Sequence, residues 1–227
     1  MHATVRRYEG VKNPQEATER VQGGFVPLIS AMTGLAAYYW VDLGYGAMLS
    51  VSVFDLLPNL TQANQSAARW IKTNLASLLT QDPRIEAGEV LAHKSMDRAG
   101  RAQRGTMPSL AASPTKPGTA SGAIDERVAQ RLKPHLTVRR YEGVTNPQEA
   151  AKQIRESFVP VIAVLPGFSA YYWVDLGHAA MLSVSVFDSF SHGVESGQTA
   201  AIWVRTNLAA VLPQNPRIEA GRVLATA

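Results

Sequence analysis

The chain has 227 residues, of which 46% are apolar and 18% are charged, and this composition is typical of a globular protein with a buried core. It contains no cysteine, so disulfide bonds, thiolate nucleophiles and cysteine-ligated metals are excluded. Residues 93–134 carry eight basic and three acidic residues, a net charge of +5. Because the whole chain has a net charge of +4, the rest of the chain has a net charge of −1. Because nucleic-acid binding needs Lys and Arg clustered on one face, we expect no nucleic-acid partner.

The N-terminal segment MHATVRRYEG lacks the apolar region of a secretion signal. No stretch approaches the roughly 20 apolar residues that span a bilayer. We therefore expect a cytoplasmic protein that does not associate with a membrane.

An internal repeat dominates the sequence. Residues 4–92 align with residues 137–225 at a constant offset of 133, with about 54 identities in 89 pairs. We predict two modules, residues 1–92 and 135–227. Residues 93–134 are rich in Ser, Gly, Pro, Ala and Arg, which is typical of a flexible basic linker, although residues 123–132 could form a short helix of marginal stability.

The first module begins with an alternating pattern over residues 4–9 that predicts a strand. The segment Asn13-Pro14-Gln15-Glu16 then predicts the start of a helix, because Asn caps helices and Pro suits the first helical position. Pro27 lies within the apolar stripe of this helix, and we expect a kink or a break there.

Two further strands are predicted at residues 37–43 and 47–54, joined by a tight turn at Gly44-Tyr45-Gly46. A second helix is predicted at residues 65–79, after a segment that differs between the two copies and therefore suggests a loop. A last strand is predicted at residues 84–91. The order βαββαβ is that of a ferredoxin-like module.

Both faces of each predicted sheet are apolar. We predict that the helices cover the face that carries Val5, Tyr39, Val41, Leu43, Leu49, Val51, Val53, Ile85 and Ala87. The opposite face carries Tyr8, Tyr38, Trp40, Met48 and Phe54 beside Arg6, Asp42, Ser50, Ser52 and Glu86. Exposing it would leave an apolar patch larger than monomers usually show. We therefore predict an α+β protein in which two modules pack sheet to sheet as one barrel, within one chain or between two, with the aromatic faces around a lumen.

The segments YYWVDLG, MLSVSVFD and PRIEAGEVLA resemble those of the dimeric α/β barrel superfamily, in particular small bacterial proteins of the antibiotic biosynthesis monooxygenase-like group. The resemblance covers both modules and leaves out the linker. It implies a barrel formed by two modules that are usually on separate chains. It implies no single activity, since such barrels include cofactor-independent oxygenases, haem-degrading enzymes and isomerases.

The candidate site consists of residues on the predicted lumen face. The candidate catalytic residues are Tyr38, Trp40 and Asp42 and their copies Tyr171, Trp173 and Asp175, because the rings could stack an aromatic substrate and the carboxylate could accept a proton. The candidate ligand-binding residues are Arg6, Tyr8, Met48, Ser50, Ser52, Phe54 and Glu86, with their copies Arg139, Tyr141, Met181, Ser183, Ser185, Phe187 and Glu219. The alternative is that the aromatics form core, that Asp42 belongs to a turn and that Arg6 and Glu86 form a structural ion pair.

Other chemistries have little support in the sequence. Ser50 and Ser52 have no matched histidine to activate them, which disfavours a nucleophile. Only His2 and His135 correspond between the modules, and neither has a ligand spacing, so we predict no metal or haem site. No phosphate-binding loop motif occurs. We expect no cofactor.

Three functions fit these observations. The first is a cofactor-independent monooxygenase or related enzyme that acts on a small aromatic or polyketide-like molecule in a barrel cavity of at least ~300 Å³. The second is a non-catalytic small-ligand-binding or stress-related barrel protein. The third is an RNA-binding pair, since RNA-recognition modules share the βαββαβ order, but the segment GAMLSVSVF lacks their basic glycine-aromatic signature.

Overall fold

The computed structural model describes residues 1–96 and 133–227. The predicted linker lies outside the described residues except for its two ends, and so does the short helix suggested at residues 123–132.

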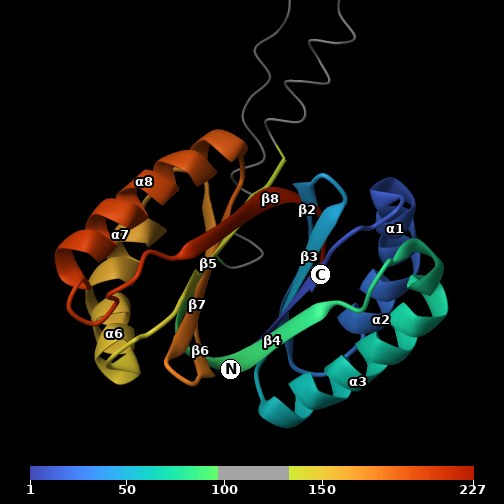
Figure 1. The fold of residues 1–227 in the computed structure, drawn as a ribbon, viewed down its shortest axis with the longest axis horizontal. Coiled ribbons are helices and arrows are strands. Elements are labelled where there is room, and N and C mark those ends of the chain that lie inside the picture. Colours follow the sequence, from blue (N-terminus) through green and yellow to red (C-terminus); the bar gives the residue numbers. More distant parts are fainter. Residues whose placement is uncertain (97–132) are drawn as a thin grey trace, which may run out of the picture.

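Eight antiparallel strands close into one barrel within the single chain, in the order β1-β3-β2-β8-β5-β7-β6-β4. The first half contributes β1 (His2–Tyr8), β2 (Leu35–Gly44), β3 (Ala47–Phe54) and β4 (Arg84–Ser95). The second half contributes β5 (His135–Tyr141), β6 (Phe168–Gly177), β7 (Ala180–Phe187) and β8 (Arg217–Thr226). Figure 1 shows the helices of the two halves on opposite outer sides of the barrel. The predicted α+β fold, two ferredoxin-like units packed as one barrel, is confirmed.

The first predicted helix is irregular where Pro27 suggested a kink. Helix α1 (Pro14–Arg20) passes through a π-helical segment, Val21–Phe25, into α2 (Val26–Ser30). Proline has no N–H to donate to the preceding turn, and a wider turn accommodates it. The second half repeats the arrangement in α6 (Pro147–Gln153), the π-helical segment Ile154–Phe158 and α7 (Val159–Ala163).

The second helix of each half begins earlier than predicted. Helix α3 spans Leu57–Asn74, and its counterpart α8 spans Phe190–Asn207. The prediction of a loop before residue 65 was wrong, because this segment forms the first two turns of these helices. The two copies therefore differ here in the side chains that the helix carries, while both remain helical.

Strands β4 and β8 join the two halves. Strand β4 pairs with β1 over its first part and with β6 from Glu89 onward, while β8 pairs with β5 and then with β2. A Cβ atom at Gly88 would lie 1.9 Å from the carbonyl oxygen of Asp175, so only glycine allows this close approach. The end of each joining strand packs against helices of the other half, as the hydrogen bond of 2.8 Å from Gln22 to the Leu224 carbonyl shows.

The assignment of the two sheet faces was wrong. The barrel interior is filled by the face that was predicted to lie under the helices. It consists of aliphatic residues such as Val5, Val41, Leu49, Val51 and Val53 together with Tyr39, and of residues of the second half such as Val138, Tyr172 and Val184. The interior of an eight-stranded barrel is only wide enough for side chains to fill it, and β-branched residues suit that space. Ile85 and Ala87, predicted with this group, are exposed on the outer side of β4.

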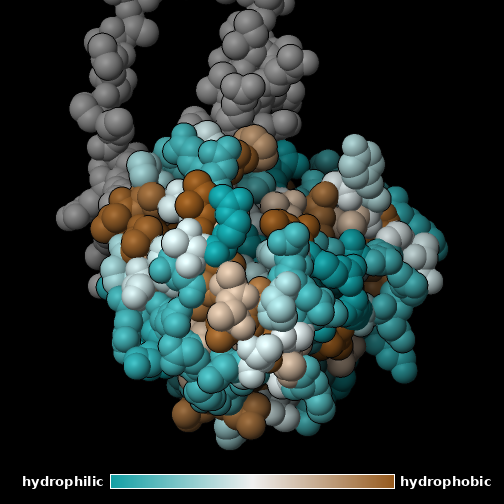
Figure 2. All heavy atoms as spheres, turned by 60° about the vertical axis from the view of Figure 1, so that its left-hand side comes forward, coloured by the Kyte–Doolittle hydropathy of each residue, from teal (hydrophilic) through white to brown (hydrophobic). Residues whose placement is uncertain are grey.

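The aromatic face lies under the helices of its own half. Tyr8, Tyr38, Trp40, Met48 and Phe54 pack with residues of α1, α2 and α3, and the second half repeats this with Tyr141, Tyr171, Trp173, Met181 and Phe187. Figure 2 shows a largely hydrophilic surface with separate hydrophobic spots, over the side that carries the second half. Most apolar residues of both sheet faces are therefore enclosed, while Ile85 and its counterpart Ile218 are exposed.

Candidate functional site

Arg6 is the central polar residue of the layer between the first sheet and its helices. It lies on β1 with its side chain on the outer face of the sheet, opposite the valines that fill the barrel. Its side chain lies beneath α3 and is only 3% exposed. Burial lowers the pKa of its guanidinium, while the neighbouring Tyr8 and Tyr38 oppose that shift.

The guanidinium of Arg6 is held by an amide and not by a carboxylate. Its Nη2 donates to Oδ1 of Asn64 on α3 at 2.5 Å, and Nδ2 of Asn64 donates to Oγ1 of Thr4 at 3.1 Å. Among the residues that the structure describes, no carboxylate lies within ion-pair distance of Arg6. A buried cation without a counter-ion is costly, so this position is suited to receive an anionic group.

Aromatic rings form the wall beside Arg6. Tyr8 meets Trp40 edge to face at 5.1 Å between ring centroids, and Phe25 meets Tyr38 at 5.3 Å and Trp70 at 5.2 Å. Burial raises the pKa of Tyr8 and raises that of Tyr38 well above the ordinary value, although Arg6 opposes both shifts. Both phenols therefore stay neutral at pH 7 and do not neutralise Arg6. The void among these rings is about 10 Å³, too small for a ligand.

A larger groove reaches Arg6 from outside. It runs between α3 and the start of β4, has a volume of about 720 Å³, and we call it the α3–β4 groove. Arg6 and Ile71 line it, with Lys72 and Asp82 at its exposed rim. This volume lies in the range of small-molecule sites.

The second half keeps the arginine but not its partner. Arg139 is 6% exposed, and its Nη1 donates to Oγ of Ser185 at 3.2 Å. Gly197 occupies the position equivalent to Asn64, and a Cβ atom there would lie 3.2 Å from Nη2 of Arg139. The two halves therefore present different surroundings to the same buried cation.

The structure brings some of the candidate residues together and separates others. Arg6, Tyr8, Tyr38, Trp40 and Ser50 lie around one small void in the sheet–helix layer. The remaining buried members of the set, Met48, Ser52, Phe54 and their copies, share this layer but do not line that void. Their predicted place in the barrel lumen was wrong, because the lumen is filled by the aliphatic face.

Asp42 and Asp175 lie two residues before the ends of β2 and β6. Oδ1 of each accepts a hydrogen bond of 2.8 Å from the backbone N–H two residues on, that of Gly44 or Gly177. Oδ2 of Asp42 also lies 3.4 Å from Nη2 of Arg222. These are the contacts of turn residues, as the alternative interpretation expected.

Glu86 and Glu219 are on the lumen side as predicted, but not with the predicted partners. In the register of β1 with β4, Arg6 lies opposite Ile85, so Arg6 and Glu86 point to opposite faces. Glu86 instead accepts a hydrogen bond of 2.7 Å from Nε of Arg140, and Glu219 pairs with Arg7. These pairs join the two halves at one end of the barrel.

The sequence interpretation missed Asn64, Lys72, Arg7 and Arg140. The adjacent arginines in RRY gave a usable signal for the last two, because neighbouring strand residues point to opposite faces and one of each pair must enter the barrel. Asn64 gave no such signal, since its counterpart is a glycine and the repeat did not single it out.

Two absences hold for the described part of the chain, residues 1–96 and 133–227. No group of three or more His, Asp or Glu residues there could hold a metal ion. No helix there is both long and apolar enough to cross a membrane.

The closed eight-stranded barrel with helices outside each sheet defines this chain as a dimeric α/β barrel protein by fold, with both sheets on one chain. No family model matches the sequence, and no curated protein matches it. Solved structures do match. A candidate monooxygenase from Fusobacterium nucleatum subsp. nucleatum superposes with a TM-score of 0.69 at 9% identity, covering 99% of this chain and 93% of that one.

Two further structures are similar. A candidate monooxygenase from Lactobacillus acidophilus has a TM-score of 0.66 at 8% identity and covers 100% of this chain and 95% of its own. An anthrone oxidase-like protein has a TM-score of 0.53 at 14% identity and covers 100% and 92%. At these identities the likeness establishes the fold and not an activity.

Proposed function

We propose that this barrel binds a small aromatic molecule with an acidic hydroxyl or carboxyl group in the α3–β4 groove, and that it oxidises this molecule with O₂ and without a cofactor. Arg6 is the anchor in this proposal. The substrate class remains the aromatic or polyketide-like one expected from the sequence, but the site is moved from the lumen to the outer side of the first sheet.

The observation that carries the proposal is the buried guanidinium of Arg6, which has no carboxylate partner among the described residues and lines a groove of about 720 Å³. A guanidinium fork binds a carboxylate or phenolate through charge-assisted hydrogen bonds. Ile71 offers an apolar surface for a ring. At the rim Lys72 adds a positive charge, which Asp82 on the same rim partly offsets. An anionic aromatic ligand would satisfy both kinds of surface.

The oxidation would need only an anion and a site that stabilises it. For a substrate with an acidic CH₂ group between aromatic rings, the reaction is R₂CH₂ + O₂ → R₂C=O + H₂O. Loss of a proton gives an electron-rich anion that reduces O₂ itself; one oxygen atom forms the carbonyl and the other leaves as water. Arg6 would stabilise that anion by its fixed charge. The descriptions of two structural neighbours as candidate monooxygenases and of a third as anthrone oxidase-like support this class of reaction.

Binding without reaction is the second candidate function. The void of about 10 Å³ beside Tyr38 and Trp40 leaves no room for a substrate among the rings, so a ligand would contact Arg6 from the groove alone. Such a site can hold an aromatic anion while leaving it in contact with water.

The test uses the full chain and a panel of hydroxylated anthrones, naphthols and aromatic acids. Thermal shift and titration calorimetry detect binding, and an oxygen electrode with mass spectrometry of the products detects oxidation. We expect saturable binding, with one equivalent of O₂ consumed per substrate. Binding without O₂ uptake would support the second candidate, and the absence of binding across the panel would overturn both.

Two exposed variants of α3 localise the binding without disturbing the core. Ala68→Tyr fills the groove, because Ala68 is exposed and lines it. Arg69→Gln changes the adjacent exposed residue, which does not line the groove, and serves as the matched control. We expect Ala68→Tyr to weaken binding at least tenfold and Arg69→Gln to leave it unchanged; equal affinities in both variants would place the ligand elsewhere.

A further inference from the structure

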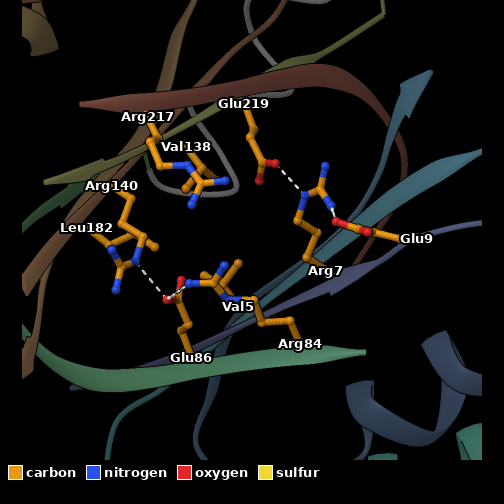
Figure 3. A pocket seen from close by; sticks show the side chains of 10 residues that line it. All are labelled: Val5, Arg7, Glu9, Arg84, Glu86, Val138, Arg140, Leu182, Arg217 and Glu219. Carbon is orange, nitrogen blue, oxygen red and sulfur yellow. Dashed lines mark hydrogen bonds and ion pairs between the residues drawn. The ribbon is translucent and has the colours of Figure 1, made fainter. Parts of the chain in front are cut away.

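A second polar hollow lies at one end of the barrel, on the lumen side and apart from the α3–β4 groove. Its volume is about 100 Å³, and Val5, Val138 and Leu182 form its apolar floor. Seven charged residues surround it: Arg7, Arg84, Arg140, Arg217, Glu9, Glu86 and Glu219. Figure 3 shows that these side chains come from strands of both halves and converge on one space.

The strand register places the arginines in two like-charged pairs. Arg7 lies directly opposite Arg84 in the pairing of β1 with β4, and Arg140 lies directly opposite Arg217 in the pairing of β5 with β8. Like charges in directly opposed positions destabilise a sheet unless negative charge lies between them. Arg84 and Arg217 are exposed, so water screens part of this repulsion, and a nearby anion would remove more of it.

The protein supplies those anions to one pair more completely than to the other. Arg7 contacts Glu9 and Glu219, and Arg84 lies 3.1 Å from Glu86, so both members of the first pair have a carboxylate partner.

In the second pair, Arg140 contacts Glu86 at 2.7 Å and also Glu142, which lies outside the hollow. Arg217 contacts no carboxylate among the described residues. Glu86 contacts both Arg84 and Arg140, whereas its counterpart Glu219 contacts Arg7 and not Arg217. Figure 3 shows the guanidinium of Arg217 directed into the hollow with no interaction drawn to it. The second pair thus keeps an unneutralised guanidinium.

We infer that the Arg140–Arg217 pair binds a phosphate-sized oxyanion at the end of the barrel. Arg140 and Arg217 line the hollow from neighbouring strands. Guanidinium groups bind the oxygens of phosphate and carboxylate groups through charge-assisted hydrogen bonds. A hollow of about 100 Å³ has the volume of roughly three water molecules, which suits inorganic phosphate or a short carboxylate and excludes an aromatic substrate. The site is therefore independent of the proposed oxidation.

The test is calorimetric titration of the full chain with inorganic phosphate at constant ionic strength, with chloride as the balancing anion. We expect saturable binding of one phosphate per chain. Arg217→Gln should weaken it roughly tenfold or more, since one charge-assisted contact is lost. Arg205→Gln, an exposed cation on α8, is the matched control and should leave the affinity unchanged.

Three outcomes would overturn the inference: heat that is not saturable, equal affinity in Arg217→Gln and in the control, or phosphate binding that the groove-filling variant Ala68→Tyr abolishes. Arg84→Gln provides a second comparison. Because Arg84 already has a carboxylate partner, this variant should weaken phosphate binding less than Arg217→Gln does. If acetate competes with phosphate, the same site also accepts a carboxylate group.

Discussion

Replacing Asn64 by alanine would test the most unusual contact in the structure. The guanidinium of Arg6 is 3% exposed and has no carboxylate partner among the described residues, so its bond of 2.5 Å to Oδ1 of Asn64 takes much of the role of a counter-ion. Asn64→Ala removes that acceptor and also leaves Oγ1 of Thr4 without its donor.

The expected loss of stability follows from these contacts. A hydrogen bond to a charged group contributes about 1.5–3 kcal/mol, and alanine recovers up to about 0.7 kcal/mol of helix propensity. We therefore expect Asn64→Ala to lower the free energy of unfolding by about 1–2 kcal/mol. For a chain of this size, that corresponds to a fall in Tm of roughly 2–8 °C.

Urea unfolding followed by tryptophan fluorescence measures this change. Gln65→Ala is the matched control, because Gln65 is the adjacent exposed residue on the same helix. A chemically simple aromatic acid that binds the groove should recover part of the loss in Asn64→Ala, since it supplies the missing negative charge. If Asn64→Ala and Gln65→Ala unfolded at the same urea concentration, Asn64 would not be stabilising a buried charge, and the argument for Arg6 would fail with it.

Three further predictions concern other parts of the barrel. Nε1 of Trp40 donates to Oγ1 of Thr18 at 3.1 Å, so Thr18→Ala leaves this buried N–H without an acceptor and should lower the free energy of unfolding in urea by about 1–3 kcal/mol. Nε1 of Trp173 has no acceptor, and Ala151→Thr should give a small gain in stability by adding one. An unchanged stability in Thr18→Ala would contradict this prediction. Ala179 adopts a left-handed backbone conformation with φ of 57°. Ala179→Gly should relieve this strain, raising the free energy of unfolding by on the order of 1 kcal/mol and Tm by a few degrees. A lower Tm would show that the turn is not strained. Burial lowers the pKa of His135 from its ordinary 6.5, so the unfolded chain binds the proton more readily than the folded one. The free energy of unfolding should therefore be full above pH 6.5 and decline as the pH falls below it. His135→Gln should flatten this decline in urea unfolding measured against pH, and an unchanged decline would refute the assignment.

The sequence predicted the fold well because its signals were local and were repeated. The strand of residues 47–54 has the predicted limits, and the Asn13 cap accepts a hydrogen bond from the backbone N–H of Glu16 as the motif suggested. Which face of the sheet lies inside the barrel could not be predicted from such local signals. Both faces of the strands are apolar, and only the narrow barrel decides that valine goes inside while Trp40 goes under the helices.

The candidate site was predicted in part. The sequence placed Arg6 beside Tyr8, Tyr38 and Trp40, and the structure keeps them together, because residues of one strand face stay neighbours whichever way that face points. It could not supply Asn64, because the contact joins residues 58 positions apart and depends on how α3 crosses the sheet. The phase of β4 was also misjudged. Ile85 is 53% exposed, an apolar residue that alternation alone would bury.

The exchange of β4 and β8 has a consequence for how the two halves can differ. Each joining strand completes the hydrophobic layer of the opposite half, so neither half has a finished core alone and the barrel should unfold in a single step. In a barrel built from identical chains, any substitution would appear at both positions at once. Here Asn64 and Gly197 show that the two halves differ beside the same buried arginine. A single chain can thus hold Arg6 and Arg139 in unlike surroundings on one shared frame, and each can be altered without its twin.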